Sequence, residues 1–154
     1  MGRKSTRENK NIYQITREEL GLTREEADEI LGGISDDRIE KIESGKSEPH
    51  PDEIMIMAKG YKKPELAMNY CSTECPIGRK YIPEIKPSEL SQIVLEILDS
   101  SNKLTEEKER LISISVDGKI TEDEYADYEV IQNTLKRLSA ASAALEIWME
   151  KQAQ

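Results

Sequence analysis

The sequence predicts an all-α protein in which a domain of five short helices is followed by a C-terminal helical hairpin or bundle. Glycines and prolines interrupt the first half about every ten residues, which suits short helices. From Ser88 onward there is no proline and a single glycine, and the apolar segments lengthen. Isoleucine, leucine and methionine must build most of the core, because the chain has no phenylalanine and one tryptophan.

Four segments are expected along the chain. They are a basic N-terminal arm over residues 1–10, a five-helix domain over 11–73, a linker over 74–87 and a C-terminal helical domain over 88–154. The linker is expected to be extended because it contains three prolines, and each proline disfavours helix at the residue before it.

A helix of the first domain is expected to begin at Arg24. Thr23 and Glu26 have the spacing of a capping box, in which each side chain binds the backbone N–H of the other residue. Gly32-Gly33 is expected to end this helix, because glycine readily adopts the left-handed backbone conformation common at helix C-termini.

A second short helix follows directly. Ser35 caps it, Ile39 and Ile42 are its inward positions, and Gly45 stops it. Two short helices around a glycine-containing turn, with the small Ala27 where they cross, are the components of a helix-turn-helix motif. The second helix of such a motif lies in the major groove of DNA.

This segment resembles the XRE family of helix-turn-helix regulators, which includes the lambdoid phage repressors and Cro. The matching positions are Leu20-Gly21-Leu22-Thr23, Ala27, Gly33-Ile34-Ser35, Ile39, Ile42-Glu43, Gly45 and Pro49. The resemblance covers roughly residues 11–71 and implies a λ-repressor-like five-helix domain that binds double-stranded DNA. It implies nothing about residues 76–154.

The resemblance also implies roles for individual residues. Arg17 is expected to pair with Glu43 and hold the first helix against the third, a structural role. Arg24 stands where the family usually has a glutamine that touches the phosphate backbone. The recognition helix is expected at about Ser35–Ser44, and the full set of expected DNA contacts is Arg24, Ser35, Asp36, Asp37, Arg38, Glu40, Lys41 and Lys46.

The expected reading face is acidic, because Asp36, Asp37 and Glu40 replace the usual Gln, Ser or Thr. Carboxylates in the first turn suit the helix dipole and can accept a hydrogen bond from cytosine N4, but they repel phosphates. The net charge is −9, and residues 11–63 hold thirteen acidic against eight basic residues. The alternative is therefore a helix-turn-helix-fold adaptor whose acidic surface binds a protein and not DNA.

The N-terminal arm is basic through Arg3, Lys4, Arg7 and Lys10. It is too polar to fold alone. Such arms can enter a minor groove or lie along phosphates, and the alternative is a tail with no role.

Two apolar stripes predict paired helices in the C-terminal domain. They are Leu90, Ile93, Val94, Ile97 and Leu98, and then Tyr128, Ile131, Leu135, Leu138, Ser142, Leu145 and Met149. The stripes fit an antiparallel hairpin within one chain, or a module that pairs two copies. The two interpretations are compatible, because a hairpin can present its outer face to a copy of itself, and a homodimer is expected.

The connection over residues 111–121 has two interpretations. Alternating apolar residues before Asp117-Gly118 favour a β-hairpin, whereas the acidic run after it favours helix. A helix–turn–helix connection is preferred, with Thr121 and Glu124 as a capping box before the last helix.

Other functions find little support in the sequence. Cys71 and Cys75 are too few for a zinc site within one chain, so a structural role is preferred over a metal or redox role. Residues 113–124 fit an EF-hand loop in length but lack its first two carboxylates. No enzyme constellation or cofactor motif is present. The basic start is not followed by an apolar segment, and no window resembles a membrane span, so a cytoplasmic protein is expected.

Overall fold

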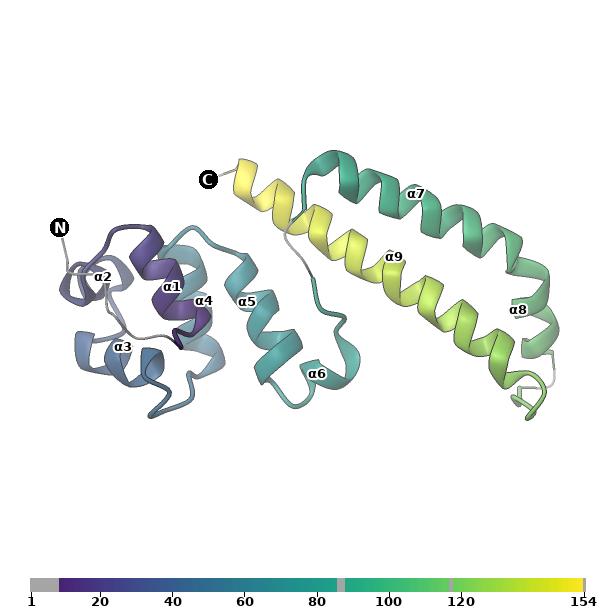
Figure 1. Cartoon of the computed structure of the whole chain (residues 1–154), viewed down its shortest axis with the longest axis horizontal. Coiled ribbons are helices and arrows are strands. Elements are labelled where there is room, and N and C mark those ends of the chain that lie inside the picture. Colours follow the sequence, from purple (N-terminus) through teal and green to yellow (C-terminus); the bar gives the residue numbers. More distant parts are fainter. Residues whose placement is uncertain (1–8, 86–87, 117, 154) are drawn as a thin grey trace.

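The computed structural model of the chain describes residues 9–85, 88–116 and 118–153, and every regular element in these ranges is a helix. In chain order they are α1 (Ile12–Glu19), α2 (Arg24–Leu31), α3 (Asp36–Glu43), α4 (Pro51–Gly60), α5 (Glu65–Asn69), η1 (Tyr70–Glu74), α6 (Gly78–Tyr81), α7 (Leu90–Glu106), α8 (Lys108–Ser115) and α9 (Tyr125–Gln152). Figure 1 shows α1 to α4 gathered at one end of an elongated molecule and α8 at the other. The predicted all-α class is confirmed.

Side-chain caps set the starts of α2 and α3. The Thr23 hydroxyl accepts a hydrogen bond from Glu26 N at 3.1 Å, and the Glu26 carboxylate accepts one from Thr23 N at 2.7 Å. Ser35 accepts a bond from Arg38 N at 3.3 Å. Gly32 ends α2 with a φ of 62°, the left-handed conformation that glycine adopts without strain. The predicted starts of both helices are confirmed.

Helices α1 to α5 surround one apolar cluster. Ala27, Ile39, Met57 and Leu66 are fully buried within it. The small Ala27 lets α2 pack closely against its neighbours, and burial of each larger side chain is worth about 1.5–3 kcal/mol relative to exposure. The cluster therefore fixes α3 against the body of the domain and leaves its opposite side in solvent.

The expected extended linker over 74–87 is only partly extended. η1 is a π-helical turn in which Cys75 N donates to Tyr70 O at 2.9 Å, and α6 then folds back against it. This return requires a glycine, because a Cβ on Gly78 would lie 1.8 Å from the carbonyl oxygen of Cys71. Pro76 and Pro83 lie on either side of α6, so neither interrupts it, and a short helix fits between them.

Helices α7 and α9 lie side by side as an antiparallel pair (Figure 1), and α8 connects them at one end. The expected seam on α9 is only half right. Leu135 and Met149 are exposed, whereas Thr134 and Ala141 are buried instead. The inward positions of α9 are Ile131, Thr134, Leu138, Ala141, Leu145 and Trp148.

The connection between α8 and α9 is the preferred helix–turn–helix, with no strand among its described residues. Glu124 reaches back to Thr121 N at 3.0 Å, as in a capping box, but α9 begins only at Tyr125. Of the expected basic arm, residues 1–8 lie outside the described residues, so the structure tests no contact of Arg3, Lys4 or Arg7.

Candidate nucleic-acid interface

Helix α3 presents one side to solvent and one to the core. Ile39 and Ile42 point inwards and are buried, whereas Asp36, Asp37 and Lys41 are exposed. The exposed side is the one that a helix-turn-helix domain places against DNA. The charge of this side depends on which nearby cations are not already bound to carboxylates.

Arg17 of α1 and Glu43 of α3 form a buried ion pair. Arg17 Nε and Nη2 donate to the two carboxylate oxygens of Glu43 at 2.5 and 2.9 Å, and the side chains are 8% and 1% exposed. The hydrogen bond to Glu43 raises the pKa of Arg17 above its usual value. Arg17 Nη1 also donates to Leu22 O at 2.6 Å. The pair thus holds three segments together, namely α1, the turn that precedes α2, and α3.

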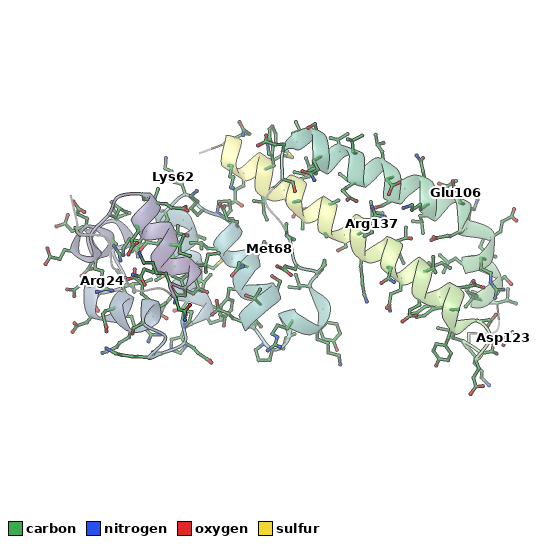
Figure 2. All side chains as sticks on the ribbon, in the orientation of Figure 1. Arg24, Lys62, Met68, Glu106, Asp123 and Arg137 are labelled. Atoms are coloured by element: carbon green, nitrogen blue, oxygen red, sulfur yellow. The ribbon has the colours of Figure 1, made fainter. Side chains whose placement is uncertain are left out.

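Arg24 is held by the same carboxylate. Its Nε donates to Glu43 Oε2 at 2.9 Å, and its side chain is 38% exposed at the start of α2 (Figure 2). The two Nη groups of Arg24 have no partner among the described residues. Because Glu43 is already bound at both oxygens by Arg17, Arg24 is an additional partner with two uncommitted nitrogen groups.

Arg38 does not face outwards from α3. Its Nε and Nη2 donate to both carboxylate oxygens of Glu53 on α4 at 2.6 and 2.7 Å. It also donates to Ser47 Oγ and to Glu48 O in the loop between the two helices. Arg38 is an expected DNA contact, but in the structure its guanidinium binds the loop after α3 and fixes this loop to α4.

Acidification should weaken this arrangement. The hydrogen bond from Arg38 lowers the pKa of Glu53 below its ordinary value of 4.5. The stabilisation is therefore fully present above pH 4.5 and is lost as the pH falls through the folded-state pKa. In urea unfolding at several pH values, the stability advantage of the wild type over Glu53→Gln should shrink on acidification. An advantage that stays constant down to the acid limit would contradict this assignment.

Lys46 and Lys41 differ in their partners. Lys46 Nζ binds Glu40 at 2.9 Å, so these two side chains offset each other near the end of α3. Lys41 is exposed and has no partner within the described ranges. The exposed side of α3 therefore combines the carboxylates of Asp36 and Asp37 with the cation of Lys41.

Comparison with known proteins places this geometry in a family. A family model described as Helix-turn-helix matches residues 14–66, from α1 into α5. These residues form an XRE-type helix-turn-helix domain. Searches of curated proteins and of solved structures give no match for the chain. The family is one of DNA-binding domains and is not an enzyme family, and the match does not extend to α7, α8 or α9.

Three residues that support the helix-turn-helix domain were not predicted from the sequence. Asp28 of α2 accepts a bond from Asp36 N at 3.2 Å and so helps to cap α3. Asn11 caps α1 and also donates to Ile42 O at 2.8 Å, at the end of α3. Glu53 holds Arg38. Asparagine and aspartate before or within a helix are common cap residues, but their partners in other helices could not be predicted from the sequence.

The described part of the chain offers no group of three or more His, Cys, Asp and Glu side chains suited to a metal ion. Cys71 and Cys75 are free thiols near the end of α5, and Cys75 Sγ accepts a weak bond from Gly78 N at 3.5 Å. None of the helices in the described ranges is both long and apolar enough to cross a membrane.

Proposed function

We propose that the protein is a sequence-specific regulator of transcription, of the repressor type, which binds double-stranded DNA as a cytoplasmic homodimer. Helix α3, with its cap Ser35, enters the major groove, and two copies meet half-sites about one DNA turn apart, or a multiple of it. The observation that carries the proposal is the helix-turn-helix domain, in which Arg24 at the start of α2 is partly exposed and bound to Glu43 of α3.

Phosphate binding is assigned first to Arg24 and Lys41. Glu43 orients the guanidinium of Arg24 through Nε, which leaves the Nη groups for a phosphate oxygen. Such charge-assisted bonds are short and strong. Lys41 adds a second cation on α3 itself, and Lys46 contributes when a phosphate replaces Glu40. Arg38 acts indirectly by fixing the loop that carries Lys46.

Base reading is assigned to the carboxylates of α3. Asp36, Asp37 and Glu40 can accept hydrogen bonds from cytosine N4 in the major groove, and each repels the phosphate backbone if it is misplaced. Recognition then depends strongly on register. Affinity for DNA of random sequence should be low for a chain of net charge −9.

The test is selection of double-stranded DNA from a random-sequence library, followed by fluorescence anisotropy across a salt series. Arg24→Ala and Lys41→Ala should each lower affinity for the selected DNA about tenfold and reduce the slope of log affinity against log salt by about one. The matched control is Lys59→Ala, which removes the same charge from an exposed lysine on α4, outside the helix-turn-helix pair α2 and α3, and should leave that slope unchanged.

Failure to select any DNA would overturn the proposal. It would also be overturned if Arg24→Ala and Lys41→Ala bound as the wild type does. An acidic protein-binding domain would then remain as the better explanation of Asp36 and Asp37.

A further inference from the structure

A cluster of ion pairs lies on one of the two broad sides of the α7/α9 pair. Arg137, labelled on α9 in Figure 2, binds Glu96 at 2.6 Å and Asp99 at 2.9 Å on α7, and Lys103 binds Asp99 at 3.1 Å. A shallow groove of about 250 Å³ on this side is lined by Gln92, Glu96, Arg137, Ala140 and Ala144, among others. These residues define the charged side of the pair.

The opposite side lacks such charges. Successive residues of a helix are about 100° apart, so Val94 and Leu98 lie on the flank of α7 away from Glu96 and Asp99. By the same geometry Leu135 lies on the flank of α9 away from Arg137. We define the uncharged side as Ser91, Val94, Leu98, Ser101 and Thr105 of α7 with Leu135, Ser139 and Ser142 of α9; all eight are exposed.

Three of these eight side chains are large and apolar. Val94, Leu98 and Leu135 are 41%, 54% and 42% exposed. Glu146 of α9 is an exposed charged residue at the end of this side, because it follows Leu135 by eleven residues and so lies only about 20° from it around the helix. Serine and threonine make up the rest, and small side chains allow another helix to approach closely.

The α7/α9 pair is poorly covered by its own chain. In the described residues from 88 to 153, the buried apolar side chains are Ile93, Ile114, Ile131 and Ala141. Two helices can bury only one stripe each against one another, whereas a four-helix bundle buries a second stripe on each helix. The apolar residues of the uncharged side occupy that second stripe.

The dimensions fit an interface between two copies. At 1.5 Å per residue, α7 is about 25 Å long, and two packed helices are about 20 Å wide. The side is thus roughly 500 Å² in projection, and its accessible area is larger because side chains stand out from it. Standard interfaces bury about 800 Å² on each partner.

We propose that the uncharged side pairs with the same side of a second copy to form a four-helix bundle. The occupant is a second copy, which can pack here although two chains of net charge −9 repel each other, because this side carries no charge apart from Glu146 at its end. A two-fold arrangement also makes the patch its own complement. This inference rests on the proposed function, in which a homodimer carries two recognition helices. It names the surface through which the two copies pair.

The experiment measures mass by sedimentation equilibrium without DNA. The wild type should sediment at twice the 17.5 kDa of the chain. Leu98→Glu/Leu135→Glu should raise the dimer dissociation constant at least ~100-fold, because four carboxylates would be buried in each dimer. The control is Val130→Glu, an exposed apolar residue (56%) on the other flank of α9, which should stay dimeric.

Circular dichroism checks that each variant keeps its helices. If the double glutamate variant unfolds, Val94→Ser/Leu98→Ser weakens the same contact without adding charge. A monomeric wild type, or glutamate variants at Leu98/Leu135 and at Val130 that behave alike, would overturn the inference. Because mass is measured without DNA, a dimer that selects no DNA would instead overturn the proposed DNA binding and leave the inference about the pairing side standing.

Discussion

Arg17→Ala is expected to lower the free energy of unfolding by about 3 kcal/mol, the largest effect of any single substitution discussed for the domain. The change leaves the buried carboxylate of Glu43 without its bidentate partner, and breaking a buried pair from one side costs about 3–5 kcal/mol. We expect a cost at the lower end of this range because Arg24 still binds Glu43 through one hydrogen bond. Urea unfolding followed by circular dichroism measures the loss.

Two controls separate burial from charge. Arg110→Ala removes an arginine from an exposed pair with Asp127, and such pairs are worth about 0–1 kcal/mol. Arg17→Met/Glu43→Leu removes both charges from the interior and should lose less stability than Arg17→Ala. If Arg17→Ala and Arg110→Ala were equally mild, the pair would not hold α1 to α3 as described.

The second large effect is expected for Gly78→Ala. The new Cβ would lie 1.8 Å from the backbone oxygen of Cys71, and a backbone atom cannot move aside as a side chain can. α6 should therefore leave η1, at a cost of about 1–3 kcal/mol or more. Hydrogen exchange of Arg79 N and Ile82 N, which bond within this turn, should become faster.

The matched change is Gly33→Ala. A Cβ at Gly33 would lie 3.3 Å from the Cδ1 atom of Ile56, the end of a flexible side chain that can shift. This substitution should cost less than Gly78→Ala and leave exchange at Arg79 unchanged. Equal exchange rates at Arg79 in the wild type and Gly78→Ala would show that α6 does not depend on the close backbone approach.

Interactions between residues close in the sequence could be predicted, whereas interactions between different helices could not. The starts of α2 and α3 could be predicted because Thr23, Glu26 and Ser35 bind backbone groups three residues away. The partner of Arg38 could not, since Glu53 lies on another helix and the loop between them decides the contact. Local caps are encoded in spacing, whereas contacts between helices depend on packing.

The same distinction explains the two corrections in the second half of the chain. α6 packs on η1 because Gly78, which has no Cβ, lets its backbone approach that of Cys71. No local sequence pattern predicts such an approach. The predicted seam of α9 rests on hydrophobicity alone. Packing against α7 buries Thr134 and Ala141, whereas Leu135 stays exposed on the uncharged side. In the proposed dimer a second copy would cover Leu135.

Helix α9 runs unbroken from Tyr125 to Gln152, and near its end Lys151 Nζ binds Glu65 of α5 at 2.9 Å. Its 28 residues span about 42 Å. In the proposed dimer α9 connects the pairing surface to the helix-turn-helix domain. The distance between the two α3 helices of the dimer then depends on the length of α9, and a change of tilt in the four-helix bundle would move each α3 relative to its major groove.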